Sequence, residues 1–132
     1  MPSIFTRIVQ GEIPSYKIAE DDRFYAFLDI NPMQRGHTLV IPKREVDYIF
    51  NLAEEEAGAL FIFARRVALA IQQVVPCKRI GVAVIGLEVP HAHIHLVPLN
   101  RERDIDFSKP KCTFTPQEFT RLADDISKAF CS

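Results

Sequence analysis

Three histidines occupy every second position of one apolar segment, and this spacing constrains the local fold more than any other feature of the chain. The segment reads His91-Ala92-His93-Ile94-His95-Leu96-Val97. On a β-strand, successive side chains point to opposite faces. We therefore predict a strand over residues 91–97, with the three imidazoles on one face and the apolar residues between them packed into a core.

The rest of the sequence predicts further strands and two helices. Runs rich in β-branched and aromatic residues predict strands at 16–19, 23–29, 37–41 and 79–85. Asn51 with Glu54 resembles a capping box and predicts the start of a long helix that ends before Pro76. Thr115 with Glu118 predicts the start of a C-terminal helix. Short connections between most strands favour an α+β fold: an antiparallel β-sheet with a long central helix and a C-terminal helix.

Length and charge narrow the classes of function. The 132 residues fit a single domain, and a formal net charge of −1 provides no broad positive field for nucleic acid or an anionic membrane. The three cysteines have no Cys-x-x-Cys spacing, which favours a reducing cytoplasm. We also expect no membrane-spanning segment, because no apolar run approaches the ~20 residues that a bilayer requires.

The chemistry of the histidine cluster has three possible interpretations. A purely structural cluster would need several buried hydrogen-bond partners. A zinc site is possible because His-x-His on a strand is a recurrent ligand geometry, but no carboxylate lies at an obvious ligand spacing. The favoured interpretation is metal-free catalysis, in which one neutral imidazole attacks phosphorus and its neighbours, one of them cationic, bind the phosphate oxygens. It implies neither a metal nor another cofactor.

The segment 91–97 resembles the signature of the histidine triad (HIT) proteins, in which apolar residues separate three histidines. Other stretches fall in the family order: Ile4-Phe5, Ile8, Gly11-Glu12-Ile13-Pro14, Glu20-Asp21-Asp22, Ala26-Phe27-Leu28-Asp29-Ile30, Pro32, Gly36-His37 and Leu39-Val40-Ile41-Pro42-Lys43. The resemblance covers about residues 3–99. It implies one HIT domain over residues 1–132, with residues 100–132 as a C-terminal tail and helix.

The resemblance implies a nucleotide hydrolase or nucleotidyl transferase that acts at the α-phosphorus of a purine nucleotide conjugate, such as a nucleoside phosphoramidate of AMP. By position, His93 resembles the nucleophile and His95 the histidine on the phosphate and leaving-group side. His37 resembles the histidine that orients the nucleophilic ring, and His91 the one that supports the triad through hydrogen bonds.

The same resemblance indicates a nucleoside pocket. Asp29 resembles the residue that accepts hydrogen bonds from the ribose hydroxyls, with Phe27 and Ile30 beside the base. Phe5 and Ile8 match the apolar residues on the other side of the base. From the residues alone, Asp29 also fits the start of a turn, and the aromatic residues also fit a core.

The sequence departs from the family pattern in three places. Ser3, Thr6 and Glu45 occupy positions where many relatives have two cysteines and a histidine that hold structural zinc. The segment before the triad, 86–90, lacks the Asn or Gln of many relatives. Leu99 replaces the arginine that often follows the triad, which removes one possible phosphate contact.

Two other functions remain open. A dinucleoside polyphosphate hydrolase would need additional cations along the polyphosphate, and the missing amide and arginine weaken that alternative. A nucleotide-binding protein with little turnover belongs to another class, and it would bind nucleotide without releasing product. The family resemblance also implies a homodimer, with the long helix that starts near Asn51 as a candidate interface.

Overall fold

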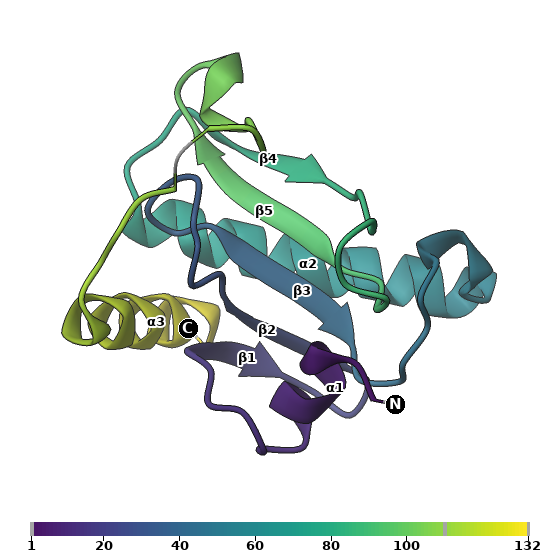
Figure 1. Ribbon diagram of the computed structural model, residues 1–132. Helices are drawn as coiled ribbons and strands as arrows, with labels where there is room; N and C mark the ends of the chain where they lie inside the picture. Colours follow the sequence, from purple (N-terminus) through teal and green to yellow (C-terminus); the bar gives the residue numbers. More distant parts are fainter. Residues whose placement is uncertain (1, 110, 132) are drawn as a thin grey trace.

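The computed structural model describes residues 2–109 and 111–131, which form a five-stranded antiparallel sheet with three α-helices (Figure 1). The strands are β1 (Lys17–Glu20), β2 (Phe24–Leu28), β3 (Thr38–Pro42), β4 (Arg79–Ala83) and β5 (Ile94–Leu99), in the spatial order β1-β2-β3-β5-β4. Each neighbouring pair is antiparallel. The predicted α+β fold class is confirmed.

The helices divide between the two faces of the sheet. α2 (Glu54–Val74) and α3 (Pro116–Cys131) pack on one face, and α1 (Ile4–Val9) packs on the other (Figure 1). The main core joins α2 and α3 to sheet residues such as Ile18 and Val40, whereas a smaller cluster joins Phe5 of α1 to Phe27 and Leu39. Two short 3-10 helices, η1 (Ile49–Asn51) and η2 (Glu102–Asp104), complete the described secondary structure.

The two helix starts differ in how well they follow the predicted capping. At α3, Thr115 Oγ1 accepts from the N–H of Glu118, and Glu118 accepts from the N–H of Thr115, so the predicted capping box is confirmed. At α2 the prediction is wrong, because Asn51 belongs to η1 and Ala53 is the N-cap without a side-chain hydrogen bond. Three glutamates in the first turn of α2 instead interact favourably with the helix dipole.

β5 is shorter than predicted at its start. It begins at Ile94, so His91 and His93 lie just before the strand, and β4 likewise ends at Ala83 rather than residue 85. The physical reason is that the backbone of residues 91–92 bonds outside the sheet, His91 N to Val89 O and Ala92 N to Val46 O. The alternation still holds from His93 onward, because Ile94 and Leu96 belong to the main core whereas His93 and His95 line the cavity on the other face.

The length and hydropathy of α2 differ from the expectation that no apolar run approaches the length that a bilayer requires. Within the described residues it is the one helix with the length and hydropathy to cross a bilayer. One face of α2 is nevertheless buried in the main core through Leu60, Phe63, Ala64, Val67, Ala70 and Ile71. This packing is that of a helix that covers a protein core.

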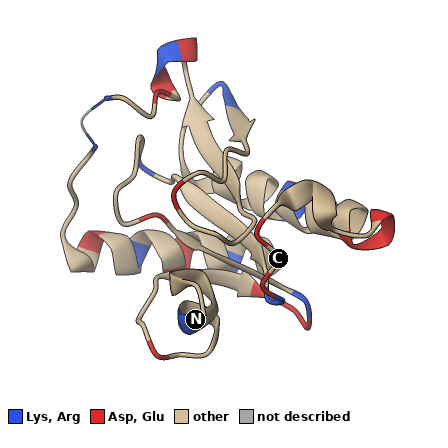
Figure 2. Cartoon of the chain, turned by 45° about the vertical axis from the view of Figure 1, so that its right-hand side comes forward, with Lys and Arg blue, Asp and Glu red and all other residues tan. Residues whose placement is uncertain are grey.

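The charged residues lie around the sheet rather than within its centre. β2, β3 and β5 contain no Lys, Arg, Asp or Glu, and their ribbons are uniformly uncharged (Figure 2). Any full charge near the middle of the sheet must therefore come from the loops around it or from histidine.

Candidate active site

A cavity of about 540 Å³ lies on the sheet face opposite α2. Its walls bring together eight of the nine residues that the sequence predicted for the site: Phe5, Ile8, Phe27, Asp29, Ile30, His37, His93 and His95. The ninth, His91, is fully buried behind the wall. The predicted site residues therefore converge in space although they span 91 positions of the chain, from Phe5 to His95.

The hydrogen bond at one nitrogen of His93 determines which of its nitrogens is free. Nδ1 lies 2.7 Å from the carbonyl oxygen of His91. Because a carbonyl only accepts, Nδ1 carries the proton and donates, which leaves the lone pair on Nε2 at the other side of the ring. The ring lines the cavity, and the edge of Phe5 packs against it at 5.0 Å between centroids. His93 is thus held in the tautomer required of a nucleophile.

His37 and His95 form a hydrogen-bonded pair whose proton positions are also determined. The N–H of Met33 donates to His37 Nδ1 across 3.0 Å, so the proton of neutral His37 is on Nε2. Nε2 in turn donates to His95 Nδ1 across 2.9 Å. Neutral His95 therefore carries its proton on Nε2, and its ring, which lines the cavity, offers a donor to a ligand.

His91 is held by polar groups from both of its sides. Its Nε2–H donates to the carbonyl oxygen of Pro42 across 2.7 Å, and Ser3 Oγ donates to its Nδ1 across 2.8 Å. Glu45 accepts from the N–H of Ser3 and from the hydroxyl of Thr6, each at 2.6 Å. The positions at which many relatives would hold zinc are therefore joined here by hydrogen bonds, which fix the residue whose carbonyl orients His93.

Burial favours the neutral form of three of the histidines. Loss of solvent is the largest of the effects that lower the pKa of His37 and of His95 to about 4. The charge of Lys111 is the second contribution for His37, whereas for His95 it contributes less than the neighbouring His37 and His93 do. Burial also lowers the pKa of His91. In the ligand-free protein at pH 7, these three side chains donate and accept hydrogen bonds without a full positive charge.

Asp29 forms the predicted turn and also lines the cavity. Oδ1 accepts from the N–H of Asn31 across 2.8 Å, which forms the predicted turn. Oδ2 lies 3.6 Å from Nε2 of His37, and the residue lines the cavity. Part of the carboxylate is therefore left for a ligand, next to the histidine pair.

Apolar side chains enclose the other end of the cavity. Phe5 and Phe27 are buried and meet edge to face at 5.6 Å, and both pack with Leu39 and Ile41. Ile8 lies beside this cluster, whereas Ile30 is 64% exposed at the rim. The surface is suited to a flat, apolar ring system.

Several cavity-lining residues escaped prediction, and two of them lie after the motif. Phe107 and His95 meet edge to face at 4.9 Å between ring centroids, and Lys111 lines the same cavity. No local pattern indicates these two residues, because residues 105–109 and 111–115 contain no helix or strand. Only the tertiary fold places them beside the histidines.

One group of side chains has the composition of a metal site. The potential ligand atoms of Asp29, His37 and His95 all lie within 4.8 Å of one another. However, the two histidine nitrogens concerned are already hydrogen-bonded to each other. A metal ion would have to replace that bond.

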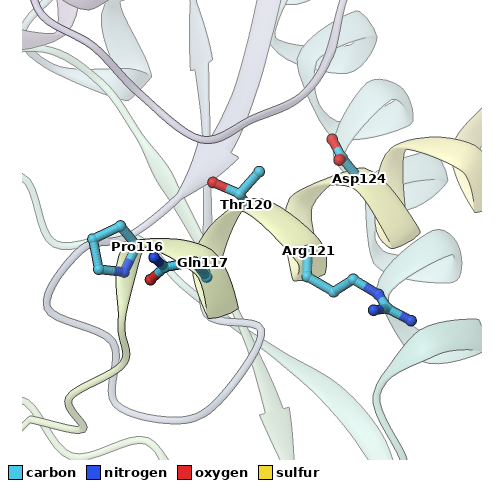
Figure 3. Close-up of a pocket in the computed structure, with 5 residues that line it drawn as sticks. All are labelled: Pro116, Gln117, Thr120, Arg121 and Asp124. Atoms are coloured by element: carbon cyan, nitrogen blue, oxygen red, sulfur yellow. The ribbon is translucent and has the colours of Figure 1, made fainter.

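A second hollow lies along the outside of α3, with a volume of about 370 Å³. It is lined by Pro116, Gln117, Thr120, Arg121 and Asp124, all from the first turns of one helix (Figure 3). Thr120 and Asp124 point to one side of the helix and Arg121 to the other, so these groups do not converge on one ligand (Figure 3). None of the predicted site residues lines it.

Comparisons of the sequence and of the fold with known proteins give a consistent result. The family model of the HIT domain matches residues 10–102 of this chain. The chain is 33% identical to the adenosine 5'-monophosphoramidase of Schizosaccharomyces pombe, over 96% of this chain and 97% of that protein. Among solved structures, it is similar to a Hit-like protein from Bartonella henselae (TM-score 0.82, 26% identity, 96% of this chain and 95% of that one). A zinc-bound histidine triad family protein from Mycobacterium smegmatis is similar too (TM-score 0.79, 27% identity, 97% and 92%). The domain match covers well over half of the chain and includes all four histidines, so this protein belongs to the HIT family.

Proposed function

We propose that the protein hydrolyses a purine nucleotide conjugate at its α-phosphorus, with a nucleoside phosphoramidate of AMP as the substrate type. The observation that carries this proposal is the pair of cavity-lining imidazoles with complementary protonation. His93 has a free Nε2 lone pair, and His95 beside it has an Nε2–H donor, with ring centroids 4.9 Å apart. The yeast relative named adenosine 5'-monophosphoramidase supports the same class of reaction.

In the first step, His93 Nε2 attacks the α-phosphorus. A phosphorus–nitrogen bond forms to His93, and the bond from phosphorus to the leaving amine breaks. The departing nitrogen takes a proton from Nε2 of His95, which substrate binding has protonated at Nδ1. The bound phosphate itself favours that protonation, because a nearby anion raises the pKa of an imidazole. His37 Nε2 then accepts from the Nδ1–H of His95, with the His37 proton moved to its own Nδ1 and the bond from the N–H of Met33 released.

In the second step, water attacks the covalent nucleotidyl-histidine. His95 Nε2, now neutral, accepts a proton from the water, the bond to His93 Nε2 breaks, and AMP is released. The hydrogen bond from His93 Nδ1–H to the His91 carbonyl stabilises the positive charge that the substituted ring carries. Both histidines return to their starting protonation states.

The nucleoside is positioned by the remaining walls. Asp29 accepts hydrogen bonds from the ribose hydroxyls through the side of the carboxylate that Asn31 does not use. Phe5, Ile8 and Phe27 contact the base, with Ile30 at the rim. In this proposal the purine lies at the apolar end and the phosphorus lies at the two histidines.

One experiment separates the proposed reaction from its alternatives. The purified protein is incubated with an adenosine phosphoramidate and with diadenosine polyphosphates, and release of AMP is measured. Faster release from the phosphoramidate supports the proposal, and faster cleavage of the polyphosphates supports the other hydrolase. Binding of AMP without release from any substrate would indicate a nucleotide-binding protein and contradict the proposal.

We also propose that the protein works as a homodimer in the cytoplasm. β4 is an edge strand whose Val82 is 51% exposed, and Phe61 and Ile62 of α2 are exposed by 57% and 64%. Pairing with a second copy would cover these apolar groups. Sedimentation analysis of the wild type and of Phe61→Glu tests this, because the charge should produce monomers. The cytoplasmic location is proposed from the cysteine content of the sequence, which has three cysteines without a Cys-x-x-Cys spacing.

A further inference from the structure

The segment between η2 and α3 closes the cavity on the side of His95. Phe107 meets the His95 ring with its edge at 4.9 Å and an interplanar angle of 82°. Lys111 lines the cavity beside it, and its Nζ donates to the carbonyl oxygen of Phe107 across 3.1 Å. The ammonium group has three N–H donors, so two remain for a ligand.

This segment is attached to the same loop that holds the histidine pair. The N–H of Cys112 donates to Pro32 O across 2.9 Å, and Cys112 Sγ donates to Met33 O across 3.4 Å. The N–H of Met33 donates in turn to His37 Nδ1. Lys111 is therefore positioned relative to His37 and His95 through direct contacts between the two segments.

The charge balance of the cavity gives Lys111 a particular importance. Among the described residues that line the cavity, Lys111 is the one Lys or Arg, and Asp29 and Glu88 carry negative charge. The central strands contribute no cation (Figure 2). A nucleotide phosphate needs positive charge close by, and the imidazoles of the empty site are neutral, because His95 gains its proton only once the phosphate is bound.

We propose that Lys111 is the cation that binds the phosphate oxygens of the nucleotide, and that it thereby makes the site selective for nucleotides over nucleosides. The inference rests on the proposed function. It assigns a substrate-binding role to a residue outside the matched domain, which ends at residue 102. A single cation fits a substrate with one phosphate better than one with a long polyphosphate.

The electrostatic effect of Lys111 on the histidines supports this placement. Its charge contributes to the lowered pKa of both His37 and His95. The same placement follows from the geometry, because Lys111, His37 and His95 line one cavity and the residue whose carbonyl accepts from Lys111, Phe107, packs on the ring of His95.

The test compares binding of AMP and of adenosine by calorimetry. In the wild type, AMP should bind more tightly than adenosine, and added salt should reduce the difference. Lys111→Met keeps most of the aliphatic stem and removes the charge. It should weaken AMP binding about tenfold or more, the size expected of a charge-assisted hydrogen bond, and leave adenosine binding unchanged. Lys111→Arg should restore most of the preference for AMP.

Lys109→Met is the matched control. Lys109 belongs to the same segment and donates to Arg103 O, but it does not line the cavity. This variant should bind AMP and adenosine as the wild type does.

Release of AMP from the phosphoramidate is measured in parallel, so that two kinds of failure can be told apart. If the wild type hydrolyses the substrate and Lys111→Met retains the full preference for AMP, the role of Lys111 is wrong and the proposed function stands. If Lys111→Met weakens adenosine and AMP equally, Lys111 has a structural role and the inference is also wrong. If the wild type neither hydrolyses the conjugate nor prefers AMP, both proposals fail.

Discussion

His37 donates its Nε2–H to Nδ1 of His95 across 2.9 Å, and this bond joins the loop before β3 to β5, the strand that contains His95. Gly36 allows this loop to lie close against the side chains of Val75 and Pro98. It has a φ of +96°, and a Cβ there would lie 3.0 Å from the Val75 side chain and 3.1 Å from that of Pro98. The pair is almost completely buried and is neutral when the site is empty.

The neutral, buried histidines predict a stability that falls in mild acid. In the unfolded chain, histidine has a pKa of about 6.5. In the folded protein, burial lowers the pKa of His37 and His95 to about 4 and also lowers that of His91. As the pH falls from about 6.5 towards 4, the unfolded state binds protons that the native state does not, so the free energy of unfolding decreases.

Urea denaturation at a series of pH values checks this prediction. Carboxylates have ordinary pKa values near 4, so a change between pH 6.5 and 5 is due mainly to histidine. A free energy of unfolding that stays constant across this interval would contradict the neutral, buried state of the histidines.

His93→Gly should abolish turnover and change AMP affinity by less than about tenfold. The variant lacks the attacking nitrogen, which matters mainly in the transition state. Release of AMP and calorimetric binding are measured on the same preparation. Mass spectrometry after an acid-free quench should find the nucleotidyl group on His93 of the wild type, whereas an adduct on His95 would reverse the two roles.

Ser3→Ala should destabilise the fold by about 2–4 kcal/mol. The loss combines an N-cap, worth about 1 kcal/mol, with a buried His91 nitrogen left without its donor, worth about 1–3 kcal/mol. Ser3 Oγ both caps α1 through the N–H of Thr6 and donates to His91 Nδ1. Urea denaturation measures the change, and the exposed Ser108→Ala is the control, with an expected effect below about 0.5 kcal/mol.

Asp29→Asn should weaken AMP binding by about 1.5–3 kcal/mol, the range for hydrogen bonds to a charged group. Asparagine retains one oxygen that can accept from the N–H of Asn31, so the turn should persist. The 2',3'-dideoxy form of AMP lacks both hydroxyls, and its affinity should be the same for both proteins. Equal AMP affinity by calorimetry would limit Asp29 to the turn.

Hydrolysis should not depend on a divalent metal, because histidines and Lys111 bind the phosphate in the proposed scheme. The rate should be unchanged after treatment with a chelator. A complete loss of activity that zinc restores would instead identify Asp29, His37 and His95 as metal ligands.

The sequence was informative where the determining interactions are local. Alternation of side chains predicted that Ile94 and Leu96 enter the main core while His93 and His95 share the other face, which lines the cavity. Thr115 with Glu118 predicted the start of α3 because both partners lie within one turn. Asn51 showed the same local pattern, but η1 includes this residue and the helix starts later. A short motif alone cannot reveal a competing turn.

The site could be predicted only as far as the motif extends. The resemblance indicated which histidines to examine, but the partners that set their protonation lie far away in the chain. Ser3 and His91 are 88 positions apart, and His37 and His95 are 58 apart. No sequence pattern indicates Lys111. Its position beside the histidines depends on the contacts of the neighbouring Cys112 with Pro32 and Met33.

The opposite environments of alternate residues in the sheet have a consequence for how this protein can change during evolution. In β2, odd-numbered Tyr25 and Phe27 belong to the cluster around Phe5, and even-numbered Phe24, Ala26 and Leu28 belong to the main core. Residues 93–96 divide in the same way. A substitution at Phe27 or at the odd histidines therefore changes the cavity and the small cluster around Phe5, whereas a substitution at a neighbouring even position changes the main core. The ligand site and the main core can thus be altered by separate substitutions along the same strands.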